Sequence, residues 1–559
     1  MDHFLPYYTD MNTNENRKLN ILPDLILLAV LAGFAFWVNR DIHIKGLYMD
    51  DLYMWSCYGE QSVWEFAFPI GTSTRFRPVY WLATYLQMMI VGTHITRFVA
   101  FNIVCNIVVA WTLFWIARRL AGCRWVGLGV GICYLASRFA YYQIGQALGL
   151  METMALLMAI VILFLLYLFI EAGWNAGIQG MPDAIGRAGD SLRQRDLRSR
   201  RRGADGGAFP FLSAVLIWFL LAFTHERYIS LFPLFYYALI VRMLQQSKGM
   251  RIRNVKDRMV LWAAPAVTLA LIILIRSFAI GKALPAGTGG TEVTDTFHIS
   301  ECIRYCVSQV LYIFGVNDGP EHLNGLPWEQ TPPMVKRMTK FSVLMIGLIC
   351  IAFLLKVLHE LFTGKRTEAA RHFAASLLFG GFIALCIGCS SVTIRVEMRW
   401  IYVSYAAALL YAAYMIGEIS GEEGLSAKRA AVTALFAAYM VLSVSCNLFY
   451  RGYFPKLYFW PNQLRMNSLA EQTVEKYGTE GVFGKDIYIL ENTYEMSDFY
   501  ARTFFKTYDP EKKAEGTTVY FVNDMSEIPA ADVRSQKALV LMEVPEENAY
   551  KDITAEFPL

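Results

Sequence analysis

The chain has 559 residues, of which 55% are hydrophobic and 18% are charged, and its net charge is only +4. A composition this apolar indicates a chain that lies mostly in lipid, and so small a net charge excludes the strongly basic surface of a nucleic-acid-binding protein. We therefore expect a polytopic membrane protein with no nucleic-acid partner.

Eleven apolar segments are long enough to cross a bilayer, since about 20 residues span the hydrocarbon core and about 17 can suffice. They lie at residues 20–39, 97–117, 125–142, 150–171, 209–224, 228–244, 259–280, 340–360, 372–392, 400–418 and 430–449. The first is expected to be a retained anchor, because no small-residue cleavage site follows it. The middles of the segments are nearly free of charge, and Arg276 is close enough to its helix end to snorkel to the interface.

Residues 78–92, "PVYWLATYLQMMIVG", are apolar but short for a span. If they do not cross, the basic residues between the spans all fall on the same face as the N-terminus, as the positive-inside rule requires. We therefore expect a helix at the outer interface. The same rule predicts a cytoplasmic N-terminus in the plasma (cytoplasmic) membrane, with the residues after the last span outside.

The predicted fold class is mainly α, with a transmembrane part at 1–449 and a small extracytoplasmic α/β domain at 450–559. In the second part, "DIYILEN", "TVYFVND" and "KALVLMEV" are typical of short strands. The cysteines show no paired zinc spacing. Cys302 and Cys306 are either a disulfide or two core thiols, and their helical spacing favours the thiols.

Ionisable residues from separate turns are predicted to meet on the outer face. They are Asp50 and Asp51 in "GLYMDDLYMWS", Arg75 and Arg77 in "TSTRFRPVYW", Glu152 at a span start, His225 and Glu226 in "THERYIS", and Arg395, Glu397 and Arg399 in "TIRVEMRW". Such a site suits an enzyme whose lipid substrate has its head group at that level. A carboxylate would accept a proton from an attacking hydroxyl or amine, and cations would stabilise a phosphate leaving group.

Plainer interpretations of these residues stay open. The aspartates could be solvated loop acids, the two arginines of the first loop interfacial anchors, and Glu152 a helix N-terminal acid favoured by the macrodipole. The sequence "HERYI" lacks the second histidine of a metalloprotease motif, so a turn held by local hydrogen bonds is at least as good an interpretation. Arg395 and Arg399 could pair only with Glu397.

The chain resembles the GT-C superfamily of glycosyltransferases over roughly residues 20–420. The resemblance rests on the acidic pair after a first span, "FRP" before an amphipathic helix, "YYQIGQALGLMET", "THERYISLFPLFYYALI" and "EMRWIYVSYAAALLY". That group includes protein O-mannosyltransferases, aminoarabinose transferases and catalytic subunits of oligosaccharyltransferases. The absence of a WWD-type motif disfavours the last branch, and Asp-Asp replaces the Asp-Glu common in mannosyltransferases.

The resemblance implies transfer of a sugar from a polyprenyl-phosphate donor to an extracytoplasmic glycan, lipid or protein acceptor, with inversion by direct displacement. It makes Asp50 the base and Asp51 its support. Arg77, Arg395 and Arg399 become candidates for the phosphate, and Glu152 and Glu226 for hydroxyl groups or a divalent metal such as Mg or Mn. Two alternatives are a lipid-linked-saccharide flippase or other transporter, and a non-catalytic membrane scaffold.

Overall fold

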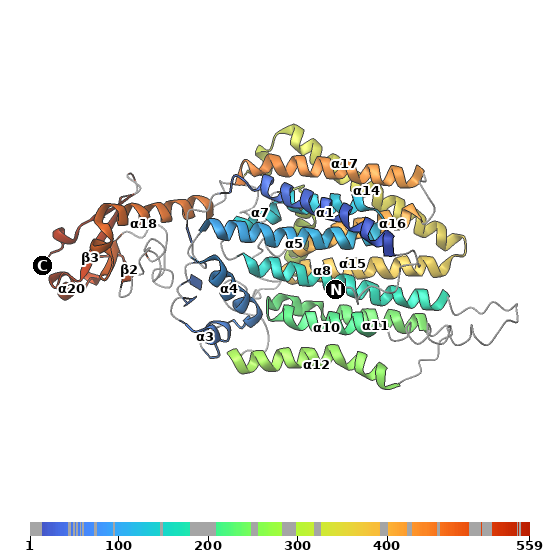
Figure 1. Ribbon diagram of the computed structural model, residues 1–559, viewed down its shortest axis with the longest axis horizontal. Coiled ribbons are helices and arrows are strands. Elements are labelled where there is room, and N and C mark those ends of the chain that lie inside the picture. The colour runs from blue at the N-terminus through green and yellow to red at the C-terminus, as the bar shows by residue number, and fades with distance from the viewer. Residues whose placement is uncertain are drawn as a thin grey trace.

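The computed structural model describes residues 14–42, 46–47, 51, 54–55, 57–58, 61–71, 75–92, 95–145, 149–178, 208–246, 255–281, 298–317, 326–391, 401–421, 427–454, 459–490, 505, 517–544, 546 and 549–558. Long helices lie side by side in a bundle, and a smaller C-terminal unit lies beyond one end of it (Figure 1). The predicted class, mainly α with a small α/β part, is confirmed.

The helices of the bundle are α1 (Asn14–Val38), α5 (Ile95–Ala121), α6 (Arg124–Ala136), α7 (Arg138–Gly145), α8 (Leu150–Ile178), α10 (Ala208–Ala222), α11 (Phe232–Gln246), α12 (Val255–Ile280), α13 (Ile299–Ile313), α14 (Pro333–Phe362), α15 (Arg366–Ser391), α16 (Tyr402–Ser420) and α17 (Ala427–Arg451). Two short 3₁₀ segments accompany them, η2 (Glu226–Leu231) and η3 (Trp328–Gln330).

Within the described ranges, eight helices are long and apolar enough to cross a membrane, so the chain is a multi-pass membrane protein. They come from α5, α8, η2 with α11, α12, α14, α15, α16 and α17. The other three predicted spans correspond to α1, α6 and α10, whose apolar parts are shorter. The total of eleven spans therefore stays a prediction.

The predicted span at 125–142 is interrupted. The helix α6 ends at Ala136, and Ser137 adopts an extended backbone (φ −67°, ψ 153°) before α7 begins at Arg138. The Ser137 hydroxyl accepts a hydrogen bond from the Ala140 amide at 3.2 Å, so it caps the new helix. Only Ser137 and Arg138, both buried, interrupt the apolar residues at this break, which is too short an interruption to reveal the end of one helix and the start of another.

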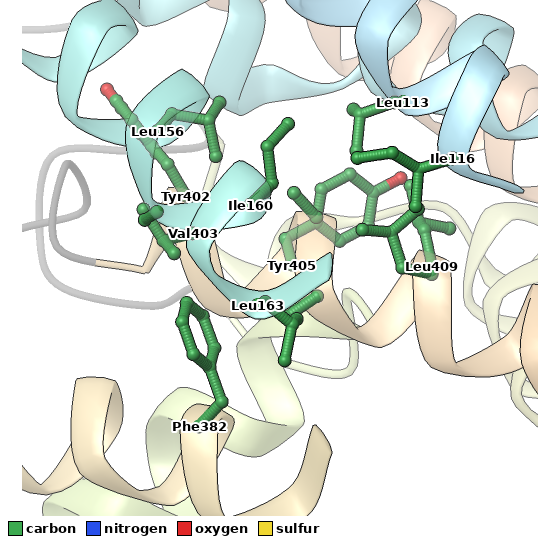
Figure 2. Packing of buried hydrophobic residues seen from close by; sticks show 14 of the residues in the cluster. Leu113, Ile116, Leu156, Ile160, Leu163, Phe382, Tyr402, Val403, Tyr405 and Leu409 are labelled. Atoms are coloured by element: carbon green, nitrogen blue, oxygen red, sulfur yellow. The ribbon is translucent and has the colours of Figure 1, made fainter. Parts of the chain in front are cut away.

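The core of the bundle lies where α5, α8, α15 and α16 meet. Side chains from these four helices converge there, among them Leu113, Leu156, Phe382 and Tyr405 (Figure 2). Close approach of α16 to α5 depends on Gly417, because a Cβ there would lie 2.1 Å from the Leu120 carbonyl oxygen. Small residues commonly allow this approach between membrane helices.

Two short helices, α3 (Val63–Ala67) and α4 (Pro78–Val91), follow the first bundle helix and lie at the bundle end that faces the C-terminal unit (Figure 1). A capping box starts α3: the Ser62 hydroxyl accepts from the Glu65 amide, and the Glu65 side chain accepts from the Ser62 amide. Hydrogen bonding to the Ser62 hydroxyl also holds the pKa of Glu65 below its usual value. The residues predicted to form an interfacial helix are helical, and their depth in the membrane stays a prediction.

The C-terminal unit contains a four-stranded sheet in the order β2-β1-β3-β4. Its elements are α18 (Phe459–Val482), β1 (Asp486–Leu490), β2 (Thr518–Val522), η7 (Met525–Glu527), α20 (Ala530–Arg534), β3 (Ala538–Val544), β4 (Ala549–Asp552) and η8 (Thr554–Glu556). The strands β2 and β3 flank β1 in parallel, and β4 is antiparallel to β3. The three predicted strands are confirmed, and the domain boundary at 449/450 stays a prediction.

Cys302 and Cys306 both lie on α13 and both are free thiols. The disulfide alternative for this pair is therefore wrong. The spacing of four residues places the two thiols on one side of the helix, which is the arrangement that the sequence favours.

Substitution of Gly417 by alanine is predicted to lower the melting temperature of the protein in detergent micelles. The added Cβ meets backbone atoms of Leu120 and Ala121, which cannot rotate away. Gly347→Ala is the matched control, since a Cβ at that helical position meets nothing within 4 Å. Equal melting temperatures for the two variants would contradict the close approach of α16 to α5.

Candidate functional site

The starts of α4 and α8, the turn between α10 and α11, and the end of α12 lie at the bundle end nearest the C-terminal unit (Figure 1). We call their ionisable residues the arginine cluster; its members are Arg77 at the N-cap of α4, Glu152 in the first turn of α8, His225 at the N-cap of η2, Glu226 and Arg227 at the start of η2, and Arg276 four residues before the end of α12. The amide of Gly71 donates to the Ala279 carbonyl at 2.9 Å, which ties the first loop to the end of α12. Residues far apart in sequence are thus held at one level.

Arg77 and Glu226 form a buried bidentate ion pair. The Arg77 Nε donates to Glu226 Oε2 and its Nη2 donates to Oε1, both at 2.7 Å. Arg77 is 5% exposed and Glu226 is 7% exposed. Pro78 at the first position of α4 places Arg77 at the N-cap, so the "FRP" motif fixes where this guanidinium lies. Bidentate geometry makes the pair both strong and directional.

Glu152 is the acidic residue of the first turn of α8 and receives a second guanidinium. Arg227 Nη2 donates to Glu152 Oε2 at 3.0 Å and to the Tyr228 hydroxyl at 2.7 Å. His225 Nε2 lies 3.6 Å from Glu152 Oε1. The predicted alternative of a locally bonded turn has support, because His225 Nδ1 accepts from the Arg227 amide at 3.4 Å.

The expectation that Arg276 snorkels is wrong. Its side chain is only 2% exposed, and its Nε and Nη1 atoms are buried with no hydrogen-bond acceptor among the described residues. The positive charge of Arg276 is attracted by the carboxylate of Glu226 and repelled by the guanidinium of Arg77. Proximity to a helix end does not decide exposure, because the side chain points into the bundle at this position. A buried guanidinium with unused donors is costly unless an anion completes it.

The remaining predicted site residues are placed less completely. Asp51 is helical and half-buried, and Arg75 is half-buried, with both lying in the first loop. Asp50, Arg395, Glu397 and Arg399 lie outside the described residues. The structure therefore brings together Arg77, Glu152, His225 and Glu226 of the predicted set.

Two members of the arginine cluster, Arg227 and Arg276, were not predicted as site residues. Arg227 could have been predicted from the sequence, because it directly follows the predicted site residues His225 and Glu226, and Glu152 needs a cationic partner. The signal for Arg276 was a charged residue inside an apolar segment, which is a functional-site hypothesis by default.

The described residues do not form a site for Mg or Mn. No group of three or more His, Cys, Asp and Glu side chains among them could hold a metal ion. Within the arginine cluster, each of the two glutamates already accepts hydrogen bonds from an arginine.

A second group of ionisable residues lies within about two turns of the helix ends at the opposite end of the bundle. We call it the Arg371 network; its members are Glu171, Lys356, Glu360, Glu368, Arg371, His372 and Glu418. Arg371 joins Glu171 of α8 at 3.2 Å to Glu418 of α16 at 2.5 Å. Lys356 lies about 9 Å from the end of α14 at 1.5 Å per residue, so this group does not contradict the expectation that the middles of the spans are nearly free of charge.

No protein-family model matches the sequence, and a search of curated proteins finds no match. Among solved structures, the chain aligns with the Archaeoglobus fulgidus oligosaccharyltransferase tethered to an acceptor peptide containing the NVT sequon (TM-score 0.43, 11% identity, 88% of this chain and 63% of that chain). It also aligns with the oligosaccharyltransferase AglB of the same organism in complex with an inhibitory peptide and a dolichol-phosphate (TM-score 0.45, 10% identity, 94% and 70%).

The chain spans less than two thirds of the first of these proteins, at 63% of its length. Both TM-scores lie below 0.5, and both identities are near 10%. At this level of similarity, the two structures assign neither a family nor an activity to this chain.

Arg77→Leu and Glu226→Leu are each predicted to destabilise the protein by about 3–5 kcal/mol, because either change leaves one buried charge without its partner. The double variant Arg77→Leu/Glu226→Leu should lose far less than the sum of the two. Denaturant unfolding of all four proteins in detergent micelles measures this coupling. Additive losses would show that the two side chains do not depend on each other.

Proposed function

We propose that this chain is a membrane glycosyltransferase that moves a sugar from a polyprenyl-phosphate donor to an acceptor at the arginine cluster. The observation that carries the proposal is the buried guanidinium of Arg276, whose Nε and Nη1 donors have no acceptor among the described residues. A phosphate oxygen is the natural complement of such a group, since guanidinium and phosphate match in charge and in planar donor geometry.

The position of the cluster supports a lipid-linked donor. It lies at the ends of apolar helices, where the phosphate of a membrane lipid resides while its chain stays in the hydrocarbon. The C-terminal unit lies beyond the same end of the bundle (Figure 1). We infer that this end is extracytoplasmic and that the acceptor, a glycan, lipid or protein, reaches the site from there.

The proposed reaction is a direct displacement with inversion. The acceptor oxygen or nitrogen forms a bond to the anomeric carbon while the bond from that carbon to the phosphate oxygen breaks, and the electron pair leaves on the polyprenyl phosphate. The acceptor proton passes to a carboxylate, for which Asp50 is the first candidate and Asp51 the second. The guanidinium of Arg276 stabilises the charge that develops on the leaving phosphate.

This reaction is that of a GT-C-type enzyme of the protein O-mannosyltransferase or aminoarabinose transferase kind. Arg77 acts mainly through position, because Glu226 already matches its charge. Glu152 and His225 are our candidates for binding hydroxyl groups of the sugar or acceptor. Arg395 and Arg399 are further candidates for the phosphate, and Arg75 for the outer surface of the site.

Asp50→Asn and Asp51→Asn are predicted to lower sugar transfer, by about 100-fold or more for the carboxylate that accepts the proton. The assay measures transfer from radiolabelled polyprenyl-phosphate sugars in membranes carrying each form of the protein, with a panel of donors. EDTA, Mg²⁺ and Mn²⁺ arms test for metal dependence. The assignment is wrong if the wild type transfers nothing from any donor, or if both variants match the wild type.

Arg276→Leu is predicted to raise the KM for the donor at least tenfold, because it removes the buried cation whose Nε and Nη1 have no acceptor among the described residues and would bind the phosphate. Arg276→Lys should keep the charge and part of the affinity. Leu274→Ala is the control, since Leu274 is on the same helix and is largely exposed. An unchanged donor KM in Arg276→Leu would show that Arg276 does not bind the phosphate of the donor.

A second candidate function is transport of a lipid-linked saccharide, and the Arg371 network is the observation that favours it. Ionisable groups buried among membrane helices are typical of ion- or proton-coupled carriers. His372 lies 3.3 Å from Glu360 and 3.0 Å from Lys356, so a proton on this ring would change the balance of charge. Transport into liposomes that persists in Asp50→Asn but is lost in His372→Gln would favour this function over transfer.

A further inference from the structure

The segment that leads into the acidic pair is bound by the C-terminal unit. On α18, Gln463 Nε2 donates to the Gly46 carbonyl at 2.9 Å, and Asn467 Nδ2 donates to the Leu47 carbonyl at 3.1 Å. Both amide side chains are buried. Gln463 and Asn467 lie one helical turn apart, so one face of α18 donates hydrogen bonds to two successive carbonyl groups of the first loop. These bonds end three residues before Asp50.

Apolar contacts hold the loop on both sides of Asp51. Leu47 precedes it, Met54 follows it, and both are buried in one hydrophobic cluster with Met466 and Leu469 of α18. Because the anchors are on either side, the half-buried Asp51 has little freedom to move along or away from this surface. The loop is thus fixed by two hydrogen bonds and by two buried side chains.

The same hydrophobic cluster reaches the arginine cluster. Met151 belongs to it and is the residue before Glu152. The Sδ atom of Met151 lies 3.2 Å from Arg77 Nη1. Packed side chains therefore connect α18 to the first loop, and the first loop to the start of α8. A displacement of α18 would therefore shift both Asp51 and the side chains that pack against Arg77.

We propose that α18 is a positioning element of the active site and that Gln463 and Asn467 are positioning residues for Asp51, the described member of the acidic pair. The proposal rests on the proposed function, because it assigns the bound loop a catalytic carboxylate. Such a carboxylate must be held within about 0.5 Å of its productive position, and a displacement of about 1 Å can cost on the order of 100-fold in rate. The C-terminal unit therefore does more than present a surface to the acceptor.

The test uses the full-length protein in lipid nanodiscs and the variants Asn467→Leu and Gln463→Ala/Asn467→Leu. Leucine has the same number of side-chain heavy atoms and the same branching as asparagine, but it cannot donate to Leu47. Ser468→Ala is the matched control, because the Ser468 hydroxyl is exposed and donates to Leu464 in its own helix. Hydrogen–deuterium exchange over residues 46–58 and the kcat and donor KM of sugar transfer are measured for each protein.

In Asn467→Leu, we expect faster exchange over residues 46–58 and a kcat at least tenfold lower, with the donor KM within about twofold of the wild type. The double variant should extend both effects, and Ser468→Ala should show neither. Unchanged exchange would overturn the proposal. Faster exchange with an unchanged kcat would also overturn it, because the contact would then serve packing alone.

The exchange measurement separates this proposal from the proposed function. If the wild type transfers no sugar but exchange over 46–58 responds to Asn467→Leu, the glycosyltransferase assignment fails, and with it the catalytic part of this proposal, while the binding of the loop by α18 stands. If transfer is robust and neither exchange nor kcat responds, the positioning role fails alone.

Discussion

The buried ion pair between Arg77 and Glu226 is the interaction on which this end of the molecule depends. It joins the first loop to the turn between α10 and α11, two segments that share no local sequence signal. Two buried ions are costly to desolvate, and only the bidentate geometry and the paired charge offset that cost. Both carboxylate oxygens of Glu226 accept hydrogen bonds from Arg77. The Nε and Nη1 atoms of Arg276 have no acceptor among the described residues.

Both ionic groups of the bundle leave buried polar atoms without a hydrogen-bond partner among the described residues: Arg371 Nε and Glu360 Oε2 in one, and Arg276 Nε and Nη1 in the other. They differ in the ion pairs that their guanidinium groups make. In the Arg371 network, one guanidinium contacts carboxylates from α8, α15 and α16, which ties three helices together. In the arginine cluster, Arg276 retains unused buried donors, which is a property suited to binding an anion rather than to holding helices. We therefore assign sugar transfer to the arginine cluster, and the alternative function, transport, to the Arg371 network.

The sequence predicted those elements whose signal is local. Strand β2 consists of β-branched and aromatic residues, and β1 and β3 each carry a run of at least four apolar residues. Strand β4, "AYKD", has no such pattern and forms because β3 offers an edge. The span at 125–142 was predicted as one helix because the two polar residues at the break interrupt the apolar residues too briefly to reveal it. Site geometry was harder: Arg77 and Glu226 are 149 positions apart, and the direction in which Arg276 points depends on packing. The role of α18 could not be predicted either, since it requires amides more than 400 positions from the loop that they bind.

The most direct test of the central claim is a cryo-electron microscopy map of the protein in nanodiscs with a bound polyprenyl monophosphate. The account predicts phosphate density within hydrogen-bonding distance of the Arg276 guanidinium, with the lipid chain running along the outside of the helices toward the hydrocarbon. Phosphate density confined to another part of the bundle, such as the Arg371 network, with the Arg276 donors still without an acceptor, would contradict it.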